Sequence, residues 1–409
     1  MQFEQGNNLP RVKVTNQSSI LRMVYHCGPI TRADIARRLE LTLPTITTNI
    51  NTMISAGLVQ ELDSTEPADH HHGRRSRLLD IIPTARKFVG VEMRGSESAV
   101  CLTNFRGQIL DSRTVPSSNR DYDYNLGMTC ALIRELLESN CLTFQDIDGL
   151  GFCVPGLVDT QAGILKVRPS YNWYDKPIFQ DVRRQLDLHC PITVENNACA
   201  RAYGASLFQR ELLNNVSTFA YLFIHAGIAC PLILNTSSSF GSIVGAGEVG
   251  HMVMEPHGPQ CTCGNHGCLE AISSNHAIIS QCVDALARGG APVLRTLCPK
   301  DSAPSMANIL EAQQAGDTDV YPIIERAIYT LGLAIANIGN FTCPHTMLIE
   351  GELFRSQENR QLLLDVVHHN ICKVTGTDTH FVFVEPDPFS GARGAAAVAI
   401  FHDLQISAE

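Results

Sequence analysis

Three cysteines and a histidine are spaced so that one short segment can close around a metal ion. Cys261, Cys263 and Cys268 fall within the sequence CTCGNHGCLE, residues 261–270, and His251 lies ten residues before the first of them. Three thiolates and one imidazole supply the four ligands that a tetrahedral structural Zn²⁺ site requires. Because four protein ligands leave no open position for water or substrate, this spacing predicts a zinc ion that shapes a loop and does no hydrolytic chemistry. The alternative is a reduced, cysteine-rich surface loop without a metal.

Composition argues against a membrane protein and against a disulfide-stabilised secreted domain. The 409 residues are enough for two or three domains, and the sequence is 44% apolar and 18% charged. No apolar run reaches the roughly 20 residues that cross a bilayer, and the polar start MQFEQGNNLP does not resemble a signal peptide. The 15 cysteines, an odd number scattered through apolar segments, indicate reduced thiols. We therefore expect a cytoplasmic protein with no membrane segment.

Charge is distributed unevenly along the chain. The net charge is −10, but residues 1–85 hold 9 Lys and Arg against 8 Asp and Glu, and the other 324 residues hold 22 against 33. The acidic part would repel nucleic acid. If the protein binds DNA, the first 85 residues must do so.

Residues 16–58 have the periodicity of three short helices. Gly28 and Pro29 end the first, and Thr31 begins the second as an N-cap, with Asp34 in its first turn. Pro44 stands in the first turn of the third, where its missing amide hydrogen has no cost. In the third helix the apolar side chains between residues 46 and 54 form one face. Its other face carries short, uncharged side chains that can hydrogen-bond DNA, and we predict DNA contacts from Thr45, Thr47, Thr48 and Asn49.

A basic hairpin follows these helices. Residues 59–62 and 78–82 have the pattern of two short strands, and between them the sequence GRRSR places three further DNA-contact candidates, Arg74, Arg75 and Arg77. Residues 1–82 thus resemble the winged helix-turn-helix of bacterial regulators, with operator DNA as the partner. The alternative is a three-helix protein-interaction module with a basic loop.

The segment Glu248-Val-Gly-His251, followed by CTCGNHGCLE, resembles the zinc and sugar signature of the ROK family, which contains repressors, uncharacterised reading frames and sugar kinases. The resemblance implies an α/β fold of two lobes, like actin, hexokinase and ribonuclease H, with a sugar between the lobes. We place the first lobe at residues 83–197 plus 389–409 and the second, which carries the zinc loop, at residues 198–388. The resemblance also implies which residues line the sugar pocket: Gly156, Asn172, Asn196, Asn197, Glu248, His251 and Glu270.

The elements that ROK kinases use for phosphoryl transfer are altered in this sequence. The first phosphate loop of those kinases resembles G-x-D-x-G-G-T, and Arg94 replaces one of its glycines here. In the second loop Pro231 removes a backbone donor. The kinase motif resembles E-N-D-A, and Asn197 stands in place of the aspartate that removes the sugar proton. The sequence therefore predicts a protein that is not an enzyme.

The leading interpretation is a sugar-responsive transcriptional regulator, most simply a repressor, similar to the glucose-, N-acetylglucosamine- and xylose-responsive repressors. We expect a homodimer or tetramer, because helix-turn-helix proteins usually bind paired half-sites. One alternative is a zinc-containing ROK sugar kinase with an appended DNA-binding domain. Another is a repressor controlled chiefly by a regulatory protein partner.

Overall fold

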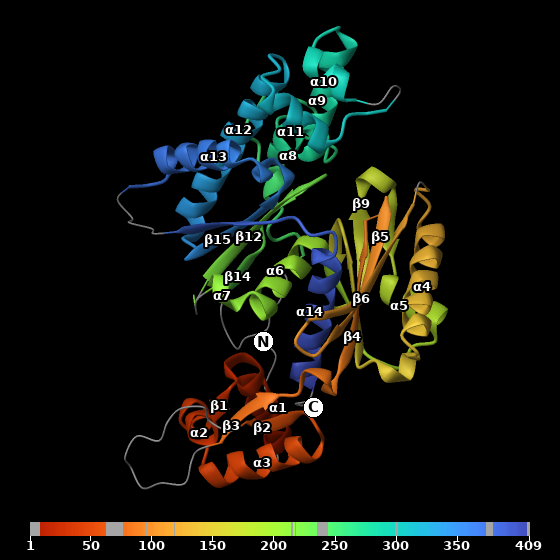
Figure 1. Cartoon of the computed structure of the whole chain (residues 1–409), viewed down its shortest axis with the longest axis vertical. Helices are drawn as coiled ribbons and strands as arrows, with labels where there is room; N and C mark the ends of the chain where they lie inside the picture. The colour runs from red at the N-terminus through yellow and green to blue at the C-terminus, as the bar shows by residue number, and fades with distance from the viewer. Residues whose placement is uncertain are drawn as a thin grey trace.

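The computed structural model has an N-terminal domain attached to one of two α/β lobes (Figure 1). It describes residues 9–62, 77–94, 96–117, 119–213, 216, 218–234, 244–298, 302–373 and 379–406. None of the helices in these ranges is long and apolar enough to cross a lipid bilayer.

The N-terminal domain is a winged helix-turn-helix, as predicted. Its helices are α1 (Leu9–Cys27), α2 (Arg32–Leu39) and α3 (Leu43–Ser55). The Thr31 hydroxyl accepts a hydrogen bond from the Asp34 N–H at 3.1 Å and so caps α2. The strands β1 (Ile30–Thr31), β2 (Val59–Leu62) and β3 (Leu78–Ile81) form an antiparallel sheet in the order β1-β3-β2.

The first lobe is built on a five-stranded sheet with the order β11-β7-β4-β5-β6. An antiparallel meander, β4 (Lys87–Met93), β5 (Glu97–Asn104) and β6 (Ile109–Pro116), is extended by the parallel strands β7 (Gly149–Val154) and β11 (Ile192–Asn196). The helices α4 (Tyr122–Ser139) and α5 (Ile178–Leu186) lie on its outer side, and α6 (Asn197–Phe208) and α14 (Ser390–Ile406) lie between the two lobes (Figure 1). A small sheet at its end contains β8 (Leu157–Asp159), β9 (Ile164–Arg168) and β10 (Trp173–Lys176). Short 3₁₀ turns span Pro83–Ala85, Phe144–Asp146 and Pro169–Tyr171.

The second lobe has the sheet order β13-β12-β15-β16, with β14 paired to β12. Its strands are β12 (Thr218–Ile224), β13 (Ile228–Ala229), β14 (Leu232–Leu234), β15 (Thr346–Gly351) and β16 (His380–Val384). Its helices are α7 (Arg210–Leu213), α8 (Leu269–Ser273), α9 (Asn275–Ala287), α10 (Pro292–Leu297), α11 (Met306–Gln314), α12 (Val320–Thr342) and α13 (Gln357–Asn370), with 3₁₀ turns at Val249–His251 and Glu352–Arg355. The apolar face of α12 is buried in the core of this lobe.

Helix α14 lies unusually close to the first sheet because both surfaces carry small residues. A Cβ atom added at Gly151 would lie 1.8 Å from the carbonyl oxygen of Ala395, and one added at Gly90 would lie 1.9 Å from that of Ala392. Only glycine fits at these two positions while the helix stays in place.

The N-terminal domain and the first lobe share one hydrophobic core. Side chains of α1 and α3 pack with Phe105 and with the C-terminal half of α14 in a single buried cluster. The Tyr25 hydroxyl donates to the carbonyl of Phe105 at 2.9 Å, and the Ser18 hydroxyl donates to that of Leu404 at 2.5 Å. The boundary expected after residue 82 therefore crosses a packed interface, and the three domain ranges stay predictions.

Candidate functional site

A cavity of about 1000 Å³ opens between the two lobes. Residues that follow β4, β7 and β11 in the first lobe and β12 and β15 in the second contribute to its wall, and such strand ends are where open α/β sheets usually bind ligands. Six of the seven residues predicted to contact a sugar line this cavity: Gly156, Asn196, Asn197, Glu248, His251 and Glu270.

The seventh predicted residue, Asn172, is not part of this wall. It is exposed and has a left-handed backbone conformation, φ 55°, at the end of the 3₁₀ turn Pro169–Tyr171. The neighbouring Trp173 is buried, and its Nε1–H donates to the carbonyl of Arg120 at 2.7 Å. Packing of the tryptophan turns Asn172 outward, while Ser170 and Tyr171 face the cavity instead.

Two carboxylates stand on the second-lobe side of the cavity. Glu270, on α8, accepts a hydrogen bond from the Ile228 N–H at 3.1 Å. Gly227 makes room for it, because a Cβ there would lie 2.9 Å from the Glu270 Oε2. Burial raises the pKa of Glu248, an effect that nearby His251 opposes and Glu270 adds to. The two side chains can accept hydrogen bonds from adjacent hydroxyl groups of one ligand.

On the first-lobe side, Asn196 organises the wall. Its Nδ2–H donates to the carbonyl of Gly156 at 2.8 Å, and its Oδ1 accepts from the Ala198 N–H at 2.8 Å as the N-cap of α6. The preceding Glu195, which sequence reasoning did not single out, is buried. Burial raises its pKa to about 7, although the Asn196 N–H donates to its Oε1 at 2.7 Å.

The four predicted metal ligands converge. His251, Cys261, Cys263 and Cys268 place one ligand atom each within 4.8 Å of all the others. The Cys263 and Cys268 sulfurs are 3.7 Å apart, and the Cys261 sulfur is 3.6 Å from the His251 Nδ1. Metal–ligand distances of about 2.3 Å to sulfur and 2.0–2.1 Å to nitrogen give tetrahedral edges of about 3.8 and 3.6 Å, so the residues fit a tetrahedral ion.

The metal loop adjoins the cavity through α8. Cys268 is the N-cap of α8, two residues before Glu270, and the Leu269 N–H donates to the Met252 carbonyl at 2.8 Å. Gly267, φ 67°, lets the loop turn tightly, because a Cβ there would lie 1.5 Å from the Glu255 carbonyl oxygen. The loop that carries the four candidate ligands therefore leads directly into the helix that holds the carboxylate of Glu270.

The exposed side of α3 carries three of the four predicted DNA-contact residues. Thr48 is exposed and Thr45 and Thr47 are partly exposed, with the Thr47 hydroxyl donating to the Leu43 carbonyl at 2.8 Å. Asn49 does not belong to this surface: it is 6% exposed, and its Nδ2–H donates to the Thr45 carbonyl at 2.8 Å. The sequence had assigned it to the wrong face, because position 49 borders the buried stripe.

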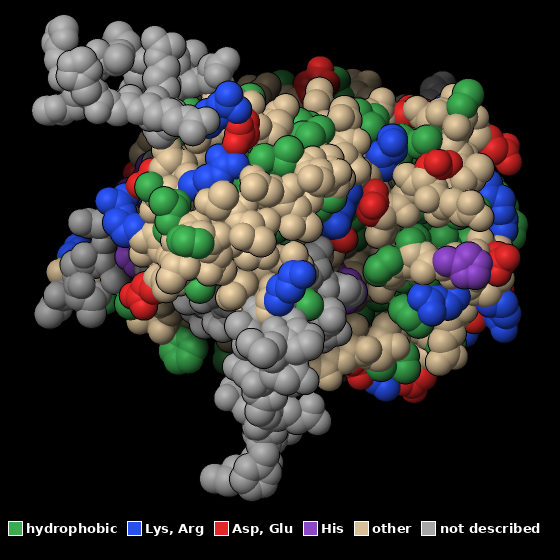
Figure 2. Space-filling model, turned by 90° about the horizontal axis from the view of Figure 1, so that it is seen from below, with side chains coloured by type: hydrophobic (Ala, Val, Ile, Leu, Met, Phe, Trp, Pro, Cys, Tyr) green, Lys and Arg blue, Asp and Glu red, His purple; other side chains and the backbone are tan. Residues whose placement is uncertain are grey.

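Only one of the three predicted wing arginines lies within the described residues. Arg77 is exposed and pairs with Glu61, which Arg32 also contacts at 2.6 Å. The hydrogen bonds from Arg77 and Arg32 lower the pKa of Glu61. Arg74 and Arg75 lie outside the described residues. Seen from this end of the molecule, the described surface is largely neutral, with scattered basic and acidic side chains (Figure 2).

Comparisons with known proteins agree with this architecture. Residues 88–401, more than half of the chain, match the model of the ROK family. The chain belongs to the ROK family. Residues 15–66 match the model of the MarR family, so this ROK protein carries a MarR-type winged helix in front of its two lobes.

This ROK protein is similar to two curated regulators and to one solved structure. It is 25% identical to the Xylose repressor of Bacillus spizizenii over 345 residues, which cover 84% of each chain. It is also 25% identical to the DNA-binding transcriptional dual regulator NagC of Escherichia coli over 354 residues, covering 85% of this chain and 83% of NagC. A crystal structure of a ROK family transcriptional regulator, a homolog of the E. coli MLC protein, shares the fold with a TM-score of 0.78 at 23% identity. That superposition covers 97% of this chain and 99% of the other.

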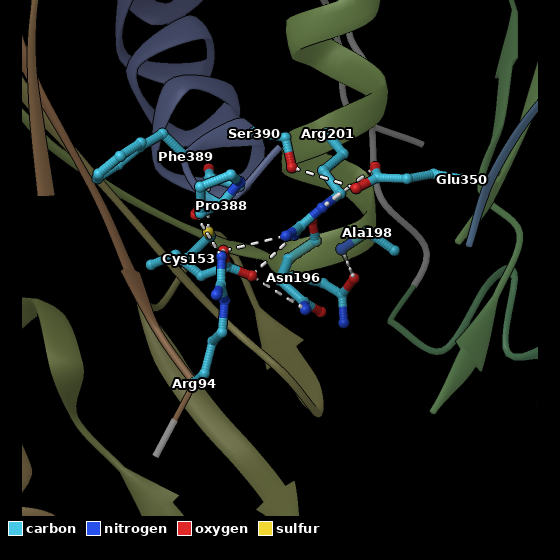
Figure 3. Close-up of polar contacts among 12 residues, drawn as sticks. Arg94, Cys153, Asn196, Ala198, Arg201, Glu350, Pro388, Phe389 and Ser390 are labelled. Atoms are coloured by element: carbon cyan, nitrogen blue, oxygen red, sulfur yellow. Dashed lines mark hydrogen bonds and ion pairs between the residues drawn. The ribbon is translucent and has the colours of Figure 1, made fainter. Parts of the chain in front are cut away.

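This ROK protein has a buried ionic cluster around Arg94, at the position where the resemblance to ROK kinases leads one to expect the first phosphate loop (Figure 3). Glu92, at the end of β4, is fully buried and accepts hydrogen bonds from Arg201 of α6 at 2.8 and 3.0 Å. The Arg201 Nε lies 3.5 Å from Glu350 of β15, and the Ser390 hydroxyl at the start of α14 donates to Glu350 at 3.3 Å. Sequence reasoning had identified Arg94 in this region but had missed Arg201, which has no local motif.

Arg94 completes this cluster. Its guanidinium donates to Glu92 at 2.8 and 2.9 Å and to the carbonyl of Pro388, just before α14. Burial raises the pKa of Glu92, but the ion pairs with Arg201 and Arg94 outweigh it and lower the pKa to about 2. Asn197 donates to the same carboxylate at 3.4 Å. The cluster thus joins the first sheet, the second sheet and α14 at one buried point.

Proposed function

We propose that this ROK protein is a sugar-responsive transcriptional repressor. Its N-terminal domain binds operator DNA, and the cavity between its lobes binds a sugar or sugar derivative. The observation that carries the proposal is that six predicted sugar-contact residues line one cavity. The winged helix shares a hydrophobic core with the first lobe, which forms one side of that cavity.

The wall chemistry supports a ligand rich in hydroxyl groups. Glu248 and Glu270 offer carboxylate oxygens as acceptors, and Asn197 offers an amide that can both donate and accept. His251, held through its Nδ1 side in the metal loop, lines the same cavity. A sugar of fixed stereochemistry can satisfy several of these groups at once, which is the basis of selectivity among sugars.

In this proposal the metal is Zn²⁺, held by His251, Cys261, Cys263 and Cys268. Bound there, zinc would be a closed structural centre with no free coordination position. The residues of the chain do the rest: Cys268 begins α8, and α8 holds Glu270 against the Ile228 N–H. Loss of the metal should therefore weaken sugar binding without direct contact between metal and sugar.

The ionic cluster supports the proposal that sugar binds without being phosphorylated. Asn197 cannot accept the proton of an attacking hydroxyl. Arg94 follows β4, where a phosphate would need free backbone donors. Its side chain instead donates hydrogen bonds to Glu92 and to the Pro388 carbonyl. The kinase alternative would require both features to be rearranged.

Helix α14 offers a physical route from the cavity to the DNA-binding domain. Its first residue bonds to Glu350 of the ionic cluster, and its last turns pack in the core shared with α1. Its 17 residues span about 25 Å. Sugar binding that changes the angle between the lobes would move this helix and with it the DNA-binding domain. In this proposal the sugar favours one lobe arrangement and the operator favours another. A homodimer or tetramer would present two such domains to paired half-sites.

The test is operator binding by the full chain, with and without sugars. An operator selected from random DNA is titrated by fluorescence anisotropy against a panel of hexoses, pentoses, amino sugars and their phosphates. We expect one sugar class to weaken operator binding. Glu270→Gln should abolish the sugar response and keep DNA binding, whereas Glu138→Gln, an exposed residue of α4, should change neither.

DNA binding and catalysis are tested separately on the same protein. Thr48→Glu on α3 should abolish operator binding by repelling phosphates while sugar binding persists, and Thr296→Glu on the distant α10 is its control. Undiminished operator affinity in Thr48→Glu would contradict the assigned DNA surface. Turnover of any sugar with ATP at the roughly 1 to 100 per second of ordinary kinases would contradict the regulator proposal. A sugar response that requires another protein would instead favour a regulatory protein partner.

A further inference from the structure

One wall of the cavity contains a buried arginine that no described carboxylate neutralises. Arg168 ends β9 and is 8% exposed. Its Nη2–H donates to the carbonyl of Arg94, and its Nη1 is covered by protein atoms without a hydrogen-bond acceptor among the described residues. Its guanidinium carbon lies 3.9 Å from the centre of the Tyr171 ring and 5.1 Å from that of Trp173. The aromatic rings hold the guanidinium in place but provide no counter-charge.

The contrast with Arg201 in the same cavity shows how unusual Arg168 is. Arg201 is 4% exposed, and although its Nε also lacks a hydrogen-bond acceptor, Glu92 and Glu350 both pair with it. A buried cation with no partner is costly, and a covered donor without an acceptor adds to that cost. Burial lowers the pKa of Arg168 to about 10, so the side chain is still positively charged at neutral pH. A bound anion would supply the missing counter-charge.

The position of Arg168 places such an anion beside the sugar site. A Cβ added at Gly156, one of the predicted sugar contacts, would lie 3.3 Å from the Cβ of Arg168. A second arginine without a described carboxylate partner, Arg120, lines the same wall. Its guanidinium carbon lies 5.6 Å from the Tyr171 ring centre, and its Nη1–H donates to the Ser170 carbonyl at 3.4 Å. Arg168 and Arg120 thus contact one tyrosine at the edge of the sugar pocket.

We propose that Arg168, assisted by Arg120, binds an anionic group of the effector, so that the effector is a negatively charged sugar. This inference rests on the proposed sugar-sensing function and specifies the chemical class of its ligand. A phosphate or a carboxylate in the cavity would supply the negative charge that the Arg168 guanidinium lacks, and these are the anions that arginine side chains bind most often.

The experiment compares neutral sugars with their charged derivatives by isothermal titration calorimetry on the full chain. The probes are glucose, xylose and N-acetylglucosamine, the 1- and 6-phosphates of the hexoses, glucuronate, and inorganic phosphate alone. We expect a charged sugar to bind about 10 to 100 times more tightly than its neutral parent, as one charged hydrogen-bonded pair provides. Phosphates and glucuronate are separate arms, because they distinguish a phosphate from a carboxylate as the anionic group.

Variants test whether Arg168 is responsible. Arg168→Gln should remove the preference for the charged sugar, measured as the ratio of the affinities for the charged and neutral forms, and Arg168→Lys should restore part of it. Arg120→Gln, at an exposed and therefore tolerant position, should reduce the preference several-fold. Arg355→Gln is the matched control: Arg355 also lines the cavity, on the second-lobe side, and its loss should leave the preference unchanged.

The outcomes separate this inference from the function on which it rests. Neutral and charged sugars that bind equally well to the unaltered protein would overturn the anion site and leave sugar sensing intact. The same holds if Arg168→Gln and Arg120→Gln both weaken neutral and charged sugars to the same degree. If no sugar of either kind binds, the sugar-sensing function itself is wrong.

Discussion

The substitution Arg201→Met provides the sharpest test of the buried ionic cluster. It removes both hydrogen bonds to Glu92 and the ion pair with Glu350, while the methionine fills most of the space. Glu92 is then fully buried with Arg94 as its remaining cationic partner beside the Asn197 amide, and Glu350, 4% exposed, loses its cation. Removing one partner of a buried ion pair typically costs about 3–5 kcal/mol.

The pKa of Glu92 gives an independent magnitude. A carboxyl whose pKa falls from 4.5 in the unfolded chain to about 2 in the fold contributes about 3 kcal/mol of stability at neutral pH. Because the folded pKa is the lower one, this contribution is complete above pH 4.5 and is lost as the pH falls toward 2. That figure covers Arg201 and Arg94 together, so the value for Arg201 alone rests on the typical cost of breaking a buried ion pair. This cost predicts that Arg201→Met lowers the melting temperature of the lobes by about 6–10 °C at pH 7.

Differential scanning calorimetry at pH 7 measures this shift. The control is Arg326→Met, which removes a partly exposed ion pair with Glu255 and should change the melting temperature by no more than about 2 °C. Adding Glu92→Gln to Arg201→Met should recover part of the loss, because the uncompensated charge is gone. The reasoning is refuted if Arg201→Met melts within 2 °C of the unaltered protein, or if the double variant loses the full sum of the two single effects.

Three further predictions concern other parts of the molecule. Burial raises the pKa of Glu195 from 4.5 to about 7, so its ionisation destabilises the fold increasingly between those pH values. Glu195→Gln should therefore stabilise by about 3 kcal/mol at pH 8 but only about 1 kcal/mol at pH 5; equal gains in denaturation at both pH values would contradict this. Protein purified without chelators should contain about one zinc per chain by elemental analysis. Cys263→Ser should lose the zinc and weaken sugar binding, whereas Cys141→Ser, at an exposed cysteine elsewhere, should keep both. Gly151→Ala should destabilise the fold by about 1–3 kcal/mol or more, because the added Cβ meets the Ala395 carbonyl. The control Gly127→Ala, with open space around it on α4, should be neutral or slightly stabilising. Equal melting temperatures of the two variants would show that α14 can shift freely.

The amino-acid sequence by itself determined the features that depend on local chemistry. Capping residues, helical periodicity and the basic hairpin predicted the winged helix, and the structure confirmed α1 to α3 and the strands that flank the wing. The spacing of His251, Cys261, Cys263 and Cys268 predicted one cluster, because turns through Gly264 and Gly267 can bring such close neighbours together. Family motifs placed six residues in one cavity. Asn196 ends β11, Asn197 begins α6 and Glu270 lies in the first turn of α8, and the fold dictates where such strand and helix ends lie.

The tertiary structure decided which side chains face the cavity and which charges meet. Burial of Trp173 turned Asn172 outward, and the packing of α3 turned Asn49 back onto the Thr45 carbonyl. Glu92, Arg201 and Glu350 come from three distant segments, and nothing in the local sequence around each one predicts that they pair. The same holds for Arg168, whose covered Nη1 lacks an acceptor among the described residues, because this shows only when its neighbours are in place. Local sequence determines backbone periodicity and ligand spacing, whereas burial and electrostatic pairing depend on neighbours that only the folded chain brings together.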